Sequence, residues 1–138
     1  MSTLERAIAI AAEAHAGQTD KAGVAYILHP LRVMLMLETE AERIVGVLHD
    51  VVEDTAVTYE DLRVAGFTEE ILAALDSVTR RDDEDYEAFV RRAGENPIGR
   101  RVKLADLKDN SDLSRIPSPT EKDYARLEKY RRAIATLS

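Results

Sequence analysis

The sequence predicts an all-α protein, a compact single-domain helical bundle over residues 1–138. Helix-start signals recur along the chain, and the apolar residues between them repeat at the three- and four-residue spacing of one helix face. No internal repeat, low-complexity tract or linker divides the chain. A chain of 138 residues is also long enough to bury a core without disulfides.

Helix-start signals mark the expected first turns. In the strongest form, the capping box, a serine or threonine precedes a glutamate by three residues, as in Thr39 and Glu42. The signals begin at Ser2, Thr39, Thr58, Thr68, Asn96 and Ser118. Proline follows Asn96 and Ser118 at the first helical position, where its missing N–H would have no partner in the helix anyway.

The expected helices follow from these signals and from the apolar spacing. Leu4, Ala7 and Ala11 give the first helix an apolar stripe, and Leu72 and Leu75 do the same for a later one. Helices are expected at 3–16, 30–38, 40–52, 58–65, 68–78, 83–93, 97–111 and 119–136. Breaks are expected at 17–23, 53–57, 80–82 and 113–118.

Composition narrows the class of protein. Hydrophobic residues at 45% and charged residues at 33% are typical of a folded globular chain, and the lack of cysteine excludes disulfides and thiolate metal sites. Residues 1–10 lack the pattern of a secretory signal, and no apolar run approaches the roughly 20 residues of a membrane span, so we expect a cytoplasmic protein without a membrane partner. The net charge of -7 disfavours nucleic acid as a partner. A small anionic ligand stays compatible, because a bound cation and nearby lysines can reverse the sign within one pocket.

A histidine–aspartate pair ends an apolar helical run. His49 and Asp50 follow residues 44–48, and Glu53 and Asp54 stand four residues after the pair. Neighbours on a helix point about 100° apart, so His49 and Asp50 can bind one metal ion only if the ion lies at that edge of the helix. A buried metal with acidic groups beside it is what hydrolysis of a phosphate ester requires.

Two more positions complete a candidate ligand set. His29 precedes Pro30, which is expected to fix the start of a helix and to leave the histidine at its mouth. Asp106 follows a largely apolar helical stretch, where a carboxylate must be exposed, paired or bound. Asn110 lies four residues on and therefore faces the same site. Imidazole and carboxylate ligands without sulfur suit Mn, Fe, Co, Ni or Zn better than Ca or Mg.

Each of these features also has an ordinary interpretation. A histidine before proline is commonly a turn or capping residue, and His49 with Asp50 at a helix end is commonly part of the surface. Asp106 and Asn110 could form the polar face of their helix. The order and spacing of the motifs decide between these interpretations.

Four motifs resemble those of the HD-superfamily metal phosphohydrolases, and within it most of all the hydrolase domain of the bifunctional Rel/SpoT alarmone enzymes. They are AHAGQ at 14–18, YILHP at 26–30, LHDVVEDT at 48–55 and VKLAD at 102–106. The likeness runs from about residue 4 to 135, and no part resembles the synthetase or regulatory domains. The chain is thus similar to a stand-alone small alarmone hydrolase with the HD-domain fold.

The resemblance implies a metal-dependent enzyme. In that family a manganese-dependent reaction removes the 3′-pyrophosphate of (p)ppGpp, a small nucleotide. The implied ligands of the one divalent metal are His29, His49, Asp50 and Asp106. Glu53 and Asp54 match the acidic pair that positions and activates the attacking water, and Asn110 matches an asparagine that orients this water or the substrate.

The resemblance also implies substrate contacts, and it identifies departures. Lys21 and Tyr26 match positions near the nucleotide. Further candidates to neutralise the phosphates are Arg80, Lys103 and Lys108. Asp20 replaces an arginine that packs on guanine in the family, and Asp112 replaces another basic residue. The metal chemistry is therefore retained, whereas recognition of the base is altered.

Three other functions stay open. One is an HD hydrolase that acts on NADPH, a nucleoside 5′-phosphate or another phosphorylated metabolite. The second is a nucleotide sensor without turnover, against which the intact set of Glu53, Asp54 and Asn110 argues. The third is a helical scaffold with solvated polar residues. The remaining histidine, His15, lies beside the Gly17 break and is expected to cap or pack rather than to bind the metal.

Overall fold

The computed structural model describes residues 3–138 and confirms the all-α fold. The helices are α1 (Leu4–Ala14), α2 (Leu28–Leu35), α3 (Glu40–Leu48), α4 (Val51–Asp54), α5 (Tyr59–Val64), α6 (Glu69–Ser77), α7 (Tyr86–Glu95), α8 (Pro97–Asn110), the 3-10 helix η1 (Leu113–Arg115) and α9 (Glu121–Leu137). Within residues 3–138, no helix is both long enough and apolar enough to cross a membrane.

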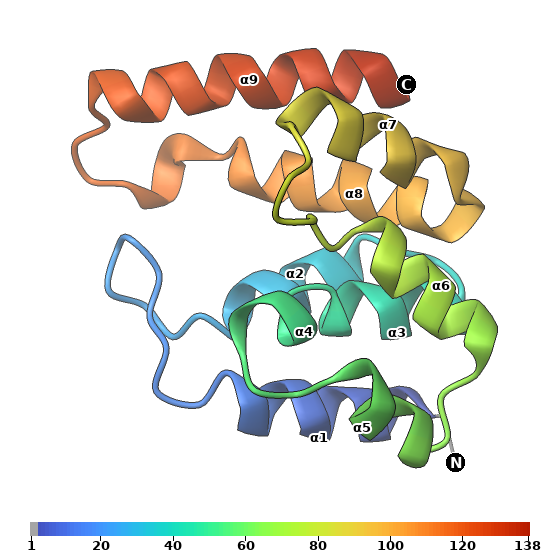
Figure 1. Ribbon diagram of the computed structural model, residues 1–138. Helices are drawn as coiled ribbons and strands as arrows, with labels where there is room; N and C mark the ends of the chain where they lie inside the picture. The colour runs from blue at the N-terminus through green and yellow to red at the C-terminus, as the bar shows by residue number, and fades with distance from the viewer. Residues whose placement is uncertain (1–2) are drawn as a thin grey trace.

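Helix α3 lies at the centre of the bundle and packs against α1, α2, α6 and α8. Figure 1 shows α1 below α2 and α3, and α7, α8 and α9 above them. The main core joins these layers around buried residues of α3 such as Val45, Val47 and Leu48. A second, smaller core holds α7, α8 and α9 together and consists of Val90, Leu107, Ala133 and Leu137.

Four of the predicted N-caps are found at the predicted residues. Thr39 and Thr58 each form a full capping box, and the side chains of Thr68 and Asn96 also accept hydrogen bonds from backbone N–H groups of the first turn. The sequence signal is therefore reliable where one hydroxyl or amide residue stands alone before the helix.

The first and last caps differ from the prediction. Ser2 lies outside the described residues, and Thr3 caps α1 by accepting a hydrogen bond of 3.1 Å from the amide of Arg6. The prediction of Ser118 as the cap of the last helix is wrong, because Thr120 and Asp123 form the capping box of α9. Two overlapping signals stand here, and the later one begins the helix.

The expected continuous helix 40–52 is interrupted at the histidine–aspartate pair. Helix α3 ends at Leu48 and α4 begins at Val51. The Nδ1–H of His49 donates to the carbonyl of Gly46 at 2.6 Å, and this carbonyl is the one that the amide of Asp50 would bind in a continuous helix. Because of this break, the side chains of His49 and Asp50 point toward the same place, although neighbouring side chains on a continuous helix point about 100° apart.

Helix α2 also begins earlier than predicted. It starts at Leu28 rather than at Pro30, so His29 lies in the first turn and is buried. Proline is tolerated there because the first turn of a helix has no internal partner for its missing N–H. The loop before α2 doubles back on itself, with an antiparallel bridge between Thr19 and Ala25.

Candidate metal centre

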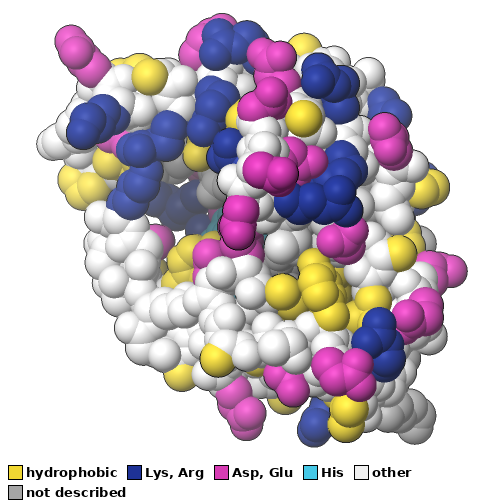
Figure 2. Space-filling view, in the orientation of Figure 1, with side chains coloured by type: hydrophobic (Ala, Val, Ile, Leu, Met, Phe, Trp, Pro, Cys, Tyr) yellow, Lys and Arg dark blue, Asp and Glu magenta, His cyan; other side chains and the backbone are white. Residues whose placement is uncertain are grey.

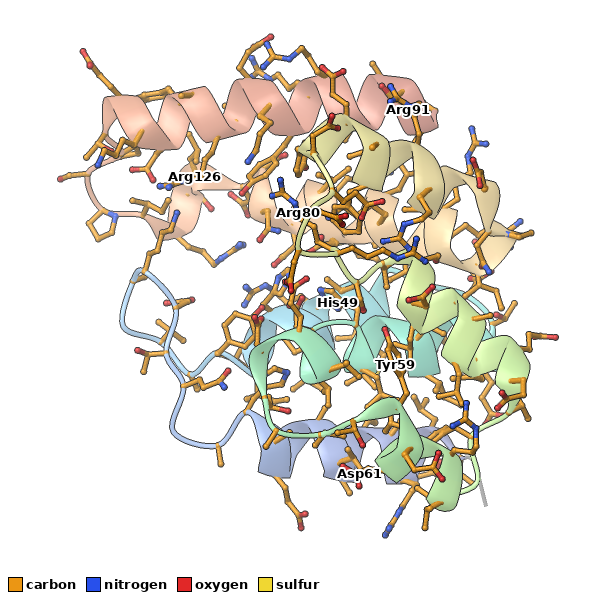
Figure 3. All side chains as sticks on the ribbon, viewed as in Figure 1. His49, Tyr59, Asp61, Arg80, Arg91 and Arg126 are labelled. Atoms are coloured by element: carbon orange, nitrogen blue, oxygen red, sulfur yellow. The ribbon has the colours of Figure 1, made fainter. Side chains whose placement is uncertain are left out.

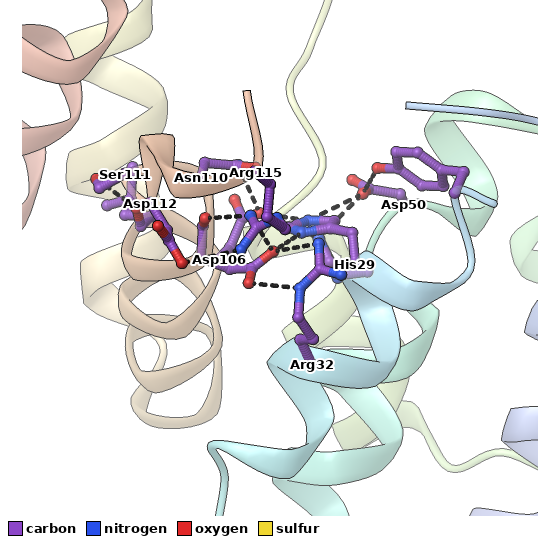
Figure 4. Close-up of polar contacts among 12 residues, drawn as sticks. His29, Arg32, Asp50, Asp106, Asn110, Ser111, Asp112 and Arg115 are labelled. Atoms are coloured by element: carbon purple, nitrogen blue, oxygen red, sulfur yellow. Dashed lines mark hydrogen bonds and ion pairs between the residues drawn. The ribbon is translucent and has the colours of Figure 1, made fainter. Parts of the chain in front are cut away.

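The four predicted metal ligands come together between α2, α3, α4 and α8 (Figure 4). Nε2 of His29 lies 3.0 Å from Oδ1 of Asp106 and 3.8 Å from Oδ2 of Asp50. Nε2 of His49 lies 3.0 Å from Oδ2 of Asp50 and 3.3 Å from Oδ1 of Asp106. Two imidazole nitrogens and two carboxylates therefore face one point.

Hydrogen bonds fix which nitrogen of each histidine faces that point. Nδ1 of His29 bonds to Oδ2 of Asp109 at 2.6 Å, and Nδ1 of His49 bonds to the carbonyl of Gly46 at 2.6 Å. Since a carbonyl can only accept, Nδ1 of His49 carries the hydrogen and the lone pair of the neutral ring stands on Nε2. Such partners orient metal-binding histidines in proteins.

The site fits a divalent metal ion. Nε2 of His49 is buried and has no hydrogen-bond partner among residues 3–138. Ligand atoms of His29, His49 and Asp106 lie within 4.8 Å of one another, and all three residues are buried. A buried nitrogen with a free lone pair, aimed at two carboxylates, is a ligand arrangement for Zn or another first-row transition metal.

Asp106 is balanced by a buried cation on its own helix. Nζ of Lys103 donates to Oδ2 of Asp106 at 3.1 Å, and Asn110 donates to Oδ1 at 3.1 Å. Burial raises the pKa of Asp106, but the positive charge of Lys103 is the largest opposing influence and helps to hold this pKa well below its usual range. Lys103 is itself packed 4.6 Å from the ring centroid of Phe89. The charge of Lys103 therefore compensates the charge of Asp106.

The predicted acidic pair adjoins the ligands. Oxygen atoms of Asp50, Glu53 and Asp54 lie within 4.8 Å of one another, and Glu53 and Asp54 are exposed. Oε1 of Glu53 accepts a hydrogen bond of 3.0 Å from the amide of Arg80. Burial raises the pKa of Asp54, and the negative charges of Asp50 and Glu53 raise it further. This carboxylate therefore binds a proton more readily than an ordinary aspartate.

Tyr26 contacts a ligand directly. Its hydroxyl donates a short hydrogen bond to Oδ2 of Asp50. Burial, followed by the charge of Asp50, raises the pKa of Tyr26, so the hydroxyl stays protonated and remains a donor. On its other side the Tyr26 ring packs 5.0 Å from the ring of His15. His15 is buried at the end of α1, outside the group of ligands, and bonds to Gln18.

A cavity of about 340 Å³ opens beside His29. Of the predicted residues, Lys21, Tyr26, His29 and Asn110 line it. Sequence reasoning missed other lining residues, namely Arg32, Asp109, Arg115, Arg126 and Tyr130. Most of these come from α9 and from the segment around η1, which carry no recognisable motif. The spacing of Asp109 three residues after Asp106 is the one local signal that could have indicated it.

The remaining predicted substrate contacts lie elsewhere or at the edge. Lys108 is exposed and lines a different cavity, together with Arg101 and Glu42, so its side chain does not reach the metal centre. Arg80 is exposed, and Figure 3 shows it between α8 and the segment that carries His49. Its Nε donates to the carbonyl of Glu84 at 3.1 Å.

The two acidic departures both stabilise turns. Oδ1 of Asp20 accepts hydrogen bonds from the amides of Ala22 and Val24, at 2.9 and 3.0 Å. Oδ1 of Asp112 accepts from the amide of Ser114 at 2.9 Å. Both residues also line the 340 Å³ cavity. The aspartates are therefore built into the loops that shape the cavity wall.

The chain is similar to curated enzymes of alarmone metabolism. It is 34% identical over 119 residues to the guanosine-3′,5′-bis(diphosphate) 3′-pyrophosphohydrolase of Aquifex aeolicus, which covers 78% of this chain and 17% of that protein. It is 36% identical over 95 residues to the bifunctional (p)ppGpp synthase/hydrolase SpoT of Escherichia coli, which covers 62% of this chain and 13% of that protein. The chain thus spans less than a fifth of the length of either relative. No protein-family model matches the chain.

A solved structure of a metazoan orthologue of SpoT that hydrolyses ppGpp has the same fold. The TM-score is 0.76 at 21% sequence identity, and the match covers 99% of this chain and 85% of that chain. The sequence likeness to the curated relatives and this shared fold confirm the resemblance that the motifs indicate. The chain is therefore a homologue of the Rel/SpoT enzymes, with the fold of an HD-type hydrolase domain.

Proposed function

We propose that the chain, as a single domain over residues 1–138, is a metal-dependent phosphohydrolase that removes the 3′-pyrophosphate of (p)ppGpp-like guanosine nucleotides. One observation carries the proposal: the four ligands converge beside an acidic pair, and one of them, His29, also lines a cavity that carries both cationic and acidic side chains. The names of the relatives supply the substrate class.

His29, His49, Asp50 and Asp106 would hold the metal, with Mn²⁺ as the proposed ion. When bound, such an ion polarises a phosphoryl oxygen and lowers the pKa of a bound water. In hydrolysis, the oxygen of water bonds to the phosphorus atom that carries the 3′ oxygen, and the bond between this phosphorus and the 3′ oxygen breaks. Pyrophosphate leaves, and the 3′ oxygen takes a proton.

The chain's own residues handle the proton and the charge. Asp54, whose pKa is raised, is placed to accept the proton of the attacking water, and Glu53, held by the amide of Arg80, positions that water. Asn110 links Asp106 to the cavity wall, where its side chain can orient the substrate. Lys21 and Arg126 line the cavity and would neutralise phosphate groups.

A second candidate is hydrolysis of a different nucleotide, such as NADPH or a nucleoside phosphate. The observation that favours it is Asp20, which gives the cavity a carboxylate where the family has a base-stacking arginine. A carboxylate lacks the planar cationic group with which arginine stacks on guanine, but it can accept hydrogen bonds from a base. The two candidates share the metal centre and differ in the nucleotide that is hydrolysed.

The deciding experiment combines metal analysis with a nucleotide panel. We expect the purified protein to contain one divalent metal and, with Mn²⁺ added, to release pyrophosphate from ppGpp. Bound metal together with release of phosphate or pyrophosphate from another nucleotide would support the metal centre and show that the substrate is not ppGpp. Binding without turnover would support a sensor, and protein that takes up no metal would refute the proposal.

A further inference from the structure

Three cations surround one tyrosine ring next to the metal centre. Nζ of Lys129 lies 4.4 Å from the centroid of the Tyr86 ring, and Nζ of Lys103 and the guanidinium carbon of Arg80 each lie 5.9 Å from it. Lys129 comes from α9, Lys103 from α8, and Arg80 from the segment between α6 and α7. Elements far apart in sequence therefore bring positive charge to one place.

Two of these charges lack an acidic partner. Lys103 pairs with Asp106, but within residues 3–138 no carboxylate lies within 4 Å of Nζ of Lys129 or of the Arg80 guanidinium. The chain has 26 acidic and 19 basic residues, so carboxylates are plentiful. Uncompensated cations at close range repel each other, and a half-buried lysine is costly to keep charged.

The same cations border the catalytic groups. The amide of Arg80 donates to Glu53, and Lys103 donates to Asp106. Lys129 stands one turn after Arg126, which lines the 340 Å³ cavity, and Lys129 itself lines a second cavity of about 410 Å³ together with Tyr86. Figure 2 shows lysine and arginine side chains along one edge of a hollow, with a histidine visible at its floor.

The electrostatic environment of Lys129 agrees with this geometry. Burial lowers the pKa of Lys129, and the charges of Arg80, Lys103 and Arg126 lower it further. An anion between Lys129 and Arg80 would remove this repulsion and stabilise both charged forms.

We propose that Lys129, together with Arg80, forms a phosphate subsite beside Tyr86 that binds a phosphate group of the nucleotide other than the one being hydrolysed. This inference rests on the proposed function and adds Lys129 as an affinity-determining residue. A phosphate group suits the site because its several charged oxygens can bind more than one of the cations that lie around the Tyr86 ring. Neither sequence spacing nor a motif indicates Lys129.

The test uses inorganic pyrophosphate as the probe and compares the protein with and without Mn²⁺, because binding that persists without the metal reports on the subsite rather than on the metal centre. Lys129→Gln should weaken pyrophosphate binding about tenfold by isothermal titration calorimetry, the effect of losing one charged hydrogen bond. Lys129→Arg should bind nearly as well as the parent protein. The matched control is Lys122→Gln, which changes an exposed lysine of the same helix that lines neither the 340 Å³ cavity nor the 410 Å³ cavity, and it should leave binding unchanged. Equal binding by Lys129→Gln and the parent protein would overturn the subsite.

A measurement on the unmodified protein guards against misfolding of the variants. Acylation of lysine amines, followed by mass spectrometry, should show that pyrophosphate protects Lys129 and leaves Lys122 reactive. Lack of protection at Lys129 would also refute the subsite. Because both readouts use pyrophosphate alone, they still report on the subsite if the nucleotide panel yields no product. Conversely, turnover of ppGpp without any role of Lys129 would leave the proposed function intact.

Discussion

Asp109 accepts a hydrogen bond of 2.6 Å from Nδ1 of His29, and it thereby directs the other ring nitrogen toward Asp106 and Asp50. The carboxylate is itself held by Arg32, with 2.8 Å between Nε and Oδ1. Asp109 thus acts on the candidate metal centre through His29 while it lines the 340 Å³ cavity.

Asp109→Asn should weaken metal binding by about 10- to 100-fold, because partners of this kind set the orientation and basicity of a metal-binding histidine. Titration calorimetry with Mn²⁺ measures the change. Asp112→Asn makes the same chemical change three residues away, outside contact with His29, and should leave the metal affinity as it is. Equal affinities for the Asp109 variant and the parent protein would show that His29 needs no such partner.

Asp50→Ala and Glu53→Ala should separate metal binding from turnover. Asp50 contributes an oxygen 3.0 Å from His49, so its loss should abolish both the bound metal and activity. Glu53 is exposed beside the ligands, and its loss should leave the metal in place and reduce kcat by about 100-fold or more. Bound Mn²⁺ should raise the Tm of the Glu53 variant but not that of the Asp50 variant. Equal loss of metal in both would refute the division of roles.

Glu84 should make the stability depend on pH in acid. Its carboxylate accepts two hydrogen bonds of 2.8 Å from the guanidinium of Arg92, which lowers the pKa of Glu84 from 4.5 to about 2. A lowered pKa in the folded state contributes stability above pH 4.5, and this contribution is lost as the pH falls toward 2. Glu84→Gln should therefore lower the free energy of unfolding by about 1–3 kcal/mol at pH 7, and by progressively less below pH 4.5.

Urea unfolding of both proteins at pH 7, 4 and 3 gives the comparison. Glu87→Gln removes an exposed glutamate three residues further along the chain, in α7, and should change the stability little at any pH. A destabilisation by Glu84→Gln that is constant over this range would exclude the ion pair as its cause.

Gly99 should not tolerate a methyl group. A Cβ atom at this position of α8 would lie 2.0 Å from Oγ of the buried Ser77 and 3.3 Å from the carbonyl of Ala93. Gly99→Ala should therefore cost about 1–3 kcal/mol of stability in denaturant unfolding. At Gly94 the added atom would meet only the flexible end of Leu137, so Gly94→Ala should cost less than the Gly99 change. The reverse order would show that α6 and α8 separate easily.

Local signals predicted the helices well because capping and apolar spacing act over three or four residues. Thr39, Thr58, Thr68 and Asn96 each cap the expected helix. The interruption at His49 could not be predicted from the same signals. It depends on a side-chain bond to the Gly46 carbonyl, which competes with the helix and leaves no trace in the periodicity.

The candidate site was predictable only as far as motifs extend. The four ligands and Asn110 belong to sequence motifs, so they could be predicted as one group. Arg126 and Tyr130 of α9 line the cavity because of tertiary packing, and no motif indicates them. Lys108 shows the opposite error. It stands two residues after Asp106, so its side chain leaves α8 in a different direction and lines another cavity.

The residues of the ligand set are synthesised at different times. The hydrogen-bonded pair His29 and Asp106 is separated by 77 positions in the chain, and Asp106 follows both histidines. During synthesis from the N-terminus, a nascent chain that exposes α1 to α6 carries the two imidazoles and Asp50, but it lacks Asp106, the other carboxylate that faces them. In the proposed function, the metal can therefore bind at full affinity only after α8 has left the ribosome and docked on α3.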